Sequence, residues 1–217
     1  MADSNAIILA SDLDLKIYDS FHVIFADKVK ADYQGLPGEV NVSSDSLAYV
    51  LFTSESTGSP KGVPIKFSNL DAFIKAFDKI GYNVDSNDRY LQLYELTFDI
   101  SVVSYLYPLL KGGCIYTVPN NAVKYVHILK LIQKYKLTFI HIVPSVIELS
   151  KTLLRGLKNS NLKHCFLAGE AINMDLVFLF QESFPNCSVW NFYGPTEAAI
   201  YCTYYRYDAS QSAKNSQ

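Results

Sequence analysis

The sequence predicts an α/β fold in which a mostly parallel sheet carries helices on its faces. From Leu47 onward, short β-branched and aromatic runs alternate with longer segments of helical periodicity. Hydrophobic residues make up 49% of the 217 residues, enough for the core of one domain or one large subdomain. The alternation favours helices packed against a sheet, and the composition allows the core that such a fold needs.

The first elements follow from residues 47–81. Residues 47–53 form an apolar run typical of a strand. Ser68 is suited to cap a helix, because Leu70, Phe73, Ile74 and Phe77 then recur at helical spacing. Gly81 is expected to end this helix.

Strands and helices then alternate to residue 192. We expect strands at 90–94, 114–118, 137–143, 164–168 and 188–192, and helices at 99–110, 122–135, 145–157 and 174–184. Residues 1–44 are interpreted as a lead-in segment with one apolar run at 21–25, and residues 45–207 as the core. The polar tail, residues 208–217, is expected to be disordered.

Composition excludes several classes of partner. The formal net charge is −2 and no basic block occurs, so we expect neither nucleic acid nor an anionic membrane as a partner. The N-terminus has a short apolar patch without a basic flank, and no stretch reaches the length of a membrane span. The sequence therefore predicts a cytoplasmic location, with small molecules or proteins as partners.

The four cysteines are predicted to be buried free thiols. Cys114, Cys165, Cys187 and Cys202 lie far apart, without a CxxC pair or a histidine at metal-ligand spacing. A metal or disulfide role is the weaker alternative.

The stretch TSESTGSPKG at 53–62 has the composition of a loop that holds a polyphosphate. Small residues let backbone N–H groups approach phosphate oxygens, hydroxyls add hydrogen bonds, and Lys61 neutralises charge. An ordinary surface turn is the alternative on composition alone. The stretch is not a Walker loop, because Gly62 and Val63 follow the lysine.

Two further motifs follow this loop in the sequence: FDIS at 98–101 and NFYGPTE at 191–197. Together with LAYVLFTS before the loop, YPLLKGG, and GEA at 169–171, they resemble the adenylate-forming enzymes. The resemblance is closest to the amino-acid adenylation domains of nonribosomal peptide synthetases and to the D-alanine:carrier protein ligases. It covers about 45–207, which implies the central part of the large N-terminal subdomain of such an enzyme.

The resemblance implies that the chain activates an amino acid with ATP and Mg²⁺, releases pyrophosphate, and passes the aminoacyl group to a carrier-protein phosphopantetheine thiol. Lys61, Thr196 and Glu197 would act on the phosphates, with Glu197 holding the metal ion. The ATP-binding set would be Thr53, Ser54, Ser56, Thr57, Gly58, Lys61, Gly169, Glu170, Ala171, Asn191, Tyr193, Gly194 and Thr196. Without the other motifs, Lys61 would be interpreted as a solvated surface lysine and Tyr193 as a core or rim tyrosine.

By the same resemblance, Asp99 would pair with the α-ammonium group of the substrate. A simple helix N-cap is the alternative for this residue. The pocket walls would be Ile100, Val103, His141, Phe166, Ala168, Phe192, Ile200 and Tyr201. Because several of these are bulky, we expect a small substrate, glycine or alanine, with His141 closing the pocket and not acting as a base.

Glu55 stands where the family's phosphate loop has glycine. At about 5 Å and an effective dielectric constant near 20, a like-charge pair with the triphosphate costs roughly 3 kcal/mol. We therefore expect weak ATP binding that improves in Glu55→Gly.

The chain ends soon after NFYGPTE, before the family's ribose-binding aspartate and its mobile C-terminal lysine, so we expect weak activity or none from this chain alone. Two alternatives follow. The chain is a non-catalytic adenylation-domain remnant that acts as a binding module, or it is an unrelated P-loop hydrolase. The residues after Lys61 disfavour the hydrolase.

Overall fold

In the computed structural model, the described residues are 41–53, 60–119, 122–155, 157 and 161–207, together with the backbone of two short strands nearer the N-terminus. The chain divides into two units, Met1–Asn41 and Val42–Gln217. In the first unit, β1 (Ile7–Ala10) and β2 (His22–Phe25) pair in parallel. The second unit carries all the motifs discussed above.

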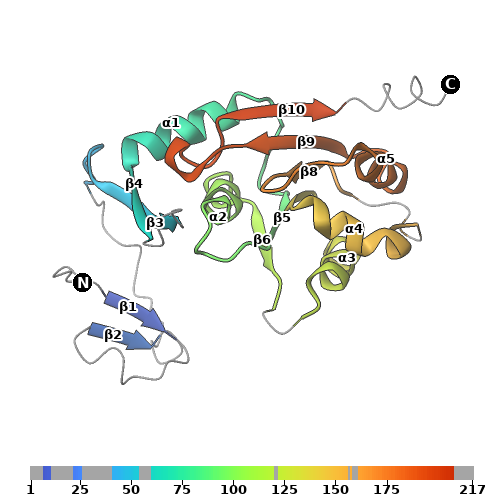
Figure 1. Cartoon of the computed structure of the whole chain (residues 1–217), viewed down its shortest axis with the longest axis horizontal. Coiled ribbons are helices and arrows are strands. Elements are labelled where there is room, and N and C mark those ends of the chain that lie inside the picture. The colour runs from blue at the N-terminus through green and yellow to red at the C-terminus, as the bar shows by residue number, and fades with distance from the viewer. Residues whose placement is uncertain are drawn as a thin grey trace. The chain divides into compact units, whose positions relative to one another are not determined.

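A six-stranded sheet in the order β10-β9-β8-β7-β5-β6 forms the centre of the second unit (Figure 1). Its strands are β5 (Arg89–Gln92), β6 (Cys114–Thr117), β7 (Phe139–Ile142), β8 (His164–Leu167), β9 (Ser188–Tyr193) and β10 (Thr203–Tyr207). Five of them are parallel, and β10 runs antiparallel to β9 at the edge. The predicted α/β class with a mostly parallel sheet is confirmed.

Five helices in the described ranges cover this sheet. They are α1 (Phe67–Asp78), α2 (Ile100–Leu110), α3 (Lys124–Tyr135), α4 (Pro144–Leu154) and α5 (Met174–Ser183). The first two pack on one face of the sheet and the last three on the other (Figure 1). None of the helices in the described ranges is long and apolar enough to cross a membrane.

The two faces of the sheet have different chemistry, because successive strand residues point to opposite sides. In β7, Phe139 and His141 face α1 and α2, whereas Ile140 and Ile142 face α3 to α5. The other parallel strands at the centre follow the same rule. We call the side with Ile140 the aliphatic face; its further strand residues are Leu91, Cys165, Leu167 and Val189. We call the side with Phe139 the aromatic face; its further strand residues are Tyr90, Phe166, Trp190 and Phe192.

A separate hairpin carries the loop at 53–62. It consists of β3 (Leu47–Thr53) and β4 (Lys61–Lys66), which pair antiparallel with Thr53 opposite Lys61. We did not predict β4, because the Pro-Lys-Gly sequence is typical of a turn. The alternation of exposed and buried residues that follows it, with Val63 and Ile65 buried, is too short to be recognised.

Helix α1 begins before the predicted cap. Lys66 is the N-cap, its backbone N–H donates to Asn69 Oδ1 over 3.1 Å, and Ser68 lies in the first turn. The helix expected at 99–110 begins at Ile100, and those expected at 122–135, 145–157 and 174–184 differ from the structure by one to three residues at an end. We also did not predict β10, since almost all of its side chains are exposed and lack the alternation of a half-buried strand.

All four cysteines are free, as predicted, but only Cys165 and Cys187 are buried. The prediction of burial was wrong for Cys114 and Cys202, which are exposed. Cys114 begins the edge strand β6, and Cys202 lies just before the edge strand β10, so neither is enclosed on both sides.

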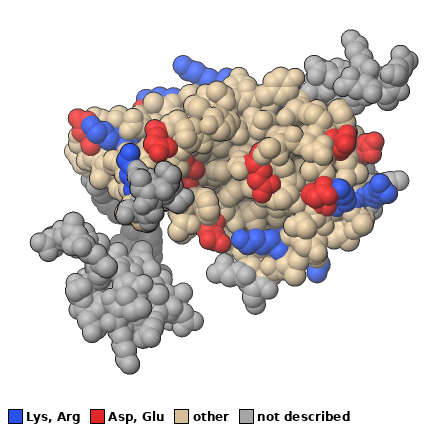
Figure 2. Space-filling model, viewed as in Figure 1, with Lys and Arg blue, Asp and Glu red and all other residues tan. Residues whose placement is uncertain are grey.

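The charged side chains of the second unit are dispersed. On the face shown in Figure 2, the lysine and arginine side chains lie mostly near the edge of the described surface and gather into no basic patch.

Candidate functional site

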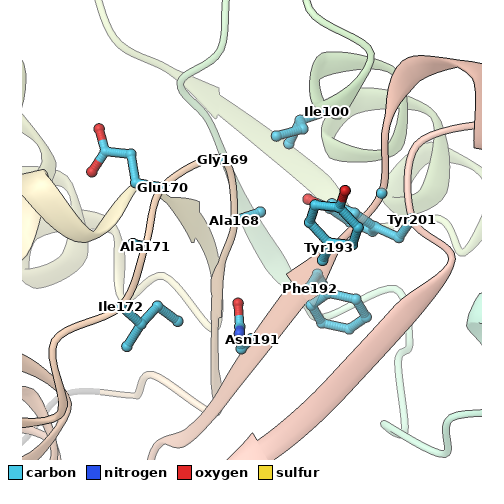
Figure 3. A pocket seen from close by; sticks show the side chains of 11 residues that line it. Ile100, Ala168, Gly169, Glu170, Ala171, Ile172, Asn191, Phe192, Tyr193 and Tyr201 are labelled. Atoms are coloured by element: carbon cyan, nitrogen blue, oxygen red, sulfur yellow. The ribbon is translucent and has the colours of Figure 1, made fainter.

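A pocket of about 620 Å³ lies where the carboxyl ends of β8 and β9 meet the start of α2 (Figure 3). Ligand sites of open α/β sheets occur at this end of the strands. The pocket is lined by Ile100, Ala168, Gly169, Glu170, Ala171, Ile172, Asn191, Phe192, Tyr193, Gly194 and Tyr201. All of these except Ile172 were candidate site residues from the sequence, so the fold brings the second and third motifs together.

The loop after β9 folds back tightly on Gly194. A Cβ atom at this position would lie 2.4 Å from the carbonyl oxygen of Ile200 and 2.6 Å from Tyr201 Cα, so only glycine fits. Ala199 and Ile200 both have positive φ angles, 58° and 78°, and such a conformation is strained for a β-branched residue. The turn that these residues form is followed directly by Tyr201, which lines the pocket.

The segment after β8 forms another wall. Gly169 has φ +84°, a conformation that glycine adopts without strain. The Glu170 carboxylate accepts hydrogen bonds from the Ser145 backbone N–H (2.9 Å) and hydroxyl (2.8 Å) at the start of α4. In Figure 3 this carboxylate points away from the other labelled side chains. The pocket therefore meets the backbone of residues 169–171 and not the Glu170 charge.

Tyr193 presents its ring at the mouth of the pocket. Its side chain is 66% exposed, although it is the last residue of a sheet strand. Asn191 lies two residues earlier on β9, and its side chain points to the same pocket (Figure 3). An exposed aromatic ring beside peptide planes and an amide suits a flat heterocycle such as adenine.

Asp99 is buried immediately before α2. It is 7% exposed, and its Oδ2 atom has no hydrogen-bond partner among the described residues. Burial raises the pKa of this carboxyl, the nearby Glu197 charge adds to the rise, and the Thr196 hydroxyl opposes it. Asp99 is the N-cap residue by position, but its side chain makes no cap hydrogen bond.

The remaining predicted wall residues, Val103, His141, Phe166 and Ile200, are buried beside the pocket residues Phe192 and Tyr201. Burial lowers the pKa of His141 to about 3, so its ring is neutral. The Ser104 hydroxyl donates to the Ile100 carbonyl (2.8 Å), which leaves its oxygen to accept from His141 Nδ1 at 3.3 Å. The ring centroids of His141 and Phe166 are 4.6 Å apart.

The candidate phosphate-binding residues are placed only at the two ends of their loop. Thr53 ends β3 and Lys61 begins β4, directly opposite each other. Four candidates, Ser54, Ser56, Thr57 and Gly58, lie outside the described residues, and so does Glu55.

Thr196 and Glu197 lie in a short 3₁₀ helix, η3 (Thr196–Ala198). The described part of the chain holds no group of three metal-ligating side chains. A single exposed carboxylate at Glu197 nevertheless fits Mg²⁺, which proteins commonly hold with one or two carboxylates and the substrate phosphates.

Sequence reasoning missed one residue that lines the pocket, Ile172. It could have been found as the neighbour of GEA.

Residues 7–217 match the protein family described as AMP-binding enzyme. The chain belongs to this family. It is 31% identical over 210 residues to tyrocidine synthase 3 of Brevibacillus parabrevis, a match that covers 94% of this chain and 3% of that synthase.

Solved structures agree with this assignment. The Vibrio cholerae adenylation domain AlmE, in complex with glycyl-adenosine-5'-phosphate, is 37% identical with a TM-score of 0.69, over 77% of this chain and 31% of AlmE. The nonribosomal peptide synthetase FmoA3 is 25% identical with a TM-score of 0.82, over 94% of this chain and 22% of FmoA3. The chain thus spans a minor part of the relatives that it matches, and it has their adenylation-domain fold.

Proposed function

We propose that this site activates a small amino acid as its adenylate. A carboxylate oxygen of the amino acid attacks the α-phosphorus of ATP, the bond to the bridging oxygen breaks, and pyrophosphate leaves. The observation that carries the proposal is the buried Asp99 carboxylate with an unpartnered oxygen, because such a group needs a cationic or hydrogen-bonding ligand. The α-ammonium group supplies both.

Each part of the pocket then has one task. Tyr193 and the backbone of residues 169–171 hold the adenine, and Asn191 hydrogen-bonds its edge. Thr53, Lys61 and the hydroxyls between them hold the β- and γ-phosphates, while Thr196 contacts the α-phosphate. Glu197 would hold Mg²⁺, which supplies neutralisation of the phosphate charge when bound.

Glycine or alanine is the proposed substrate. The pocket walls include Phe192 and Tyr201, and the rings of Phe166 and His141 pack against them. A larger side chain would have to displace these packed rings, which is costly. The glycyl-adenylate in AlmE, a relative at 37% identity, supports a small substrate.

A carrier-protein phosphopantetheine thiol is the proposed acceptor of the aminoacyl group, and a cytoplasmic location, where ATP is available, is part of the proposal. The second candidate function is a binding module that holds nucleotide without turnover. Glu55 in the phosphate loop favours this candidate, because its charge opposes a triphosphate.

Calorimetry with a non-hydrolysable glycyl-adenylate tests the proposal. We expect the chain to bind this analogue and Asp99→Asn to weaken binding at least about tenfold, as hydrogen bonds to charged groups contribute roughly 1.5–3 kcal/mol. Asp71→Asn, an exposed carboxylate on α1 paired with Lys75, is the control and should bind like the parent chain. Failure of the parent chain to bind would refute the site. Pyrophosphate exchange then separates the enzyme from the binding module.

A further inference from the structure

A second pocket, of about 580 Å³, lies at the opposite end of β9 from the candidate site. It forms where the end of α5 and the loop after it meet the start of β9 and the end of β10 (Figure 1). A pocket of this volume is large enough for a small organic molecule. The two pockets share no lining residue, so a ligand here would leave the candidate site unoccupied.

The lining of the second pocket carries one full charge, the guanidinium of Arg206. No aspartate or glutamate lines this pocket. Among the described residues, Arg206 also forms no ion pair with a carboxylate. A positive charge in a concave wall without a counter-ion favours an anionic ligand.

The Arg206 guanidinium is held in place by two neighbours on β9. Its Cζ atom lies 5.2 Å from the centroid of the Trp190 ring, and its Nη2 donates to Ser188 Oγ over 3.0 Å. A guanidinium has five N–H donors, and Ser188 uses one of them. Its planar edge matches two oxygens of a carboxylate or a phosphate. Because the group is oriented in advance, a ligand loses less free energy in ordering it.

The amide of Gln181, at the end of α5, is a second polar group of the lining with unused hydrogen-bonding capacity. Its Oε1 atom is buried and has no partner among the described residues. Its nitrogen also has no such partner, but it is not buried, so a ligand can reach it. Asn186 adds another side-chain amide, while Pro185 and Tyr207 supply apolar surface. The pocket therefore combines N–H donors with a small apolar wall.

We propose that this second pocket binds a small organic oxyanion, a carboxylate or a phosphate ester. Its charge pairs with Arg206, its further oxygens accept from the amide N–H groups of Gln181 and Asn186, and its body packs against Pro185 and Tyr207. A cation would be repelled by Arg206, and a purely apolar ligand would leave the donors unsatisfied. The inference does not depend on the proposed function, because the site uses none of the same residues.

The chain has a built-in readout for this site. Trp190 is its only tryptophan, so tryptophan fluorescence reports on the ring beside Arg206. We would titrate the chain with phenyl phosphate, benzoate and inorganic phosphate, and confirm each affinity by calorimetry. We expect saturable binding of phenyl phosphate or benzoate with a Kd at or below about 1 mM. Inorganic phosphate should bind at least about fivefold more weakly, because it has no apolar body, and uncharged benzyl alcohol should not bind.

Variants locate the binding. Arg206→Gln should weaken it at least about tenfold, and Gln181→Leu, which keeps the size of the side chain, about threefold. Arg155→Gln is the matched control: it removes the same charge from an exposed arginine at the end of α4, outside the pocket, and should leave the affinity unchanged. Lys61→Gln should also leave it unchanged, which separates this site from the phosphate loop. Calorimetry gives these affinities, and thermal unfolding checks that each variant is folded.

The relative affinities then decide the class of ligand. Tighter binding of phenyl phosphate indicates a phosphate ester, and tighter binding of benzoate indicates a carboxylate. The inference is overturned if no probe saturates, if Arg206→Gln binds like the parent chain, or if inorganic phosphate binds as tightly as both organic anions. Loss of binding in Lys61→Gln would overturn it too, because the anion would then occupy the phosphate loop.

Discussion

The two faces of the central sheet come from the same strands and differ in what they bury. The aliphatic face packs leucine, isoleucine and valine under α3, α4 and α5, and none of its described strand residues leaves a buried oxygen without a partner. The aromatic face buries Asp99, His141 and several tyrosines with unpartnered hydroxyls. The difference teaches that both faces are packed cores, but only the aromatic face also encloses polar groups, among them Asp99 of the candidate site.

The largest expected effect is on the aliphatic face. Ile140→Ala removes a fully buried side chain between helices and sheet, and should lower the free energy of unfolding by about 2–5 kcal/mol. Urea denaturation measures this loss. Glycyl-analogue affinity of the folded protein should stay within about twofold, because Ile140 is not among the residues that line the pocket. A loss of affinity as large, in free energy, as the loss of stability would show that the two faces of the sheet do not act separately.

Acid should destabilise the aromatic face through His141. Burial lowers its pKa from 6.5 to about 3, so its contribution to stability is present above pH 6.5 and is lost as the pH falls toward 3. Between pH 6.5 and 5 the free energy of unfolding should fall by about 2 kcal/mol because of this residue.

Chemical denaturation at several pH values in this range gives the slope of the free energy of unfolding against pH. His141→Gln should reduce this slope by about one proton relative to the parent chain. An identical slope in the variant and the parent chain would place the acid sensitivity elsewhere.

The smallest expected effect concerns Glu170. This residue connects the pocket wall at residues 169–171 to α4, which packs on the aliphatic face. Glu170→Gln keeps the shape and removes the charge that faces the Ser145 backbone N–H at the helix start. We expect a loss of about 1 kcal/mol in the free energy of unfolding. Glu148→Gln, which breaks only an exposed pair with Lys151 on the same helix, should cost less than about 0.5 kcal/mol. Equal losses would mean that the link contributes nothing.

Most of the central sheet could be predicted from sequence, because its parallel strands are short apolar runs between clear helical patterns. The edge strand β10 could not, because almost all of its side chains are exposed and apolar and polar residues do not alternate. The hairpin strand β4 could not, because its first residues are typical of a turn. The residues lining the pocket could be predicted through their motifs. The second pocket could not, because β10, the strand that carries Arg206, was itself not predicted.

The register of the β3–β4 hairpin has a consequence for how the phosphate loop can vary. Pairing of Thr53 with Lys61 is held by the alternate burial of Val63 and Ile65, and a slip by one residue would expose both. The described anchors of the loop therefore lie in the two strands. We expect a replacement between them, such as Glu55, to alter affinity for a triphosphate without disturbing this pairing, so that nucleotide binding and stability can diverge in this part of the chain.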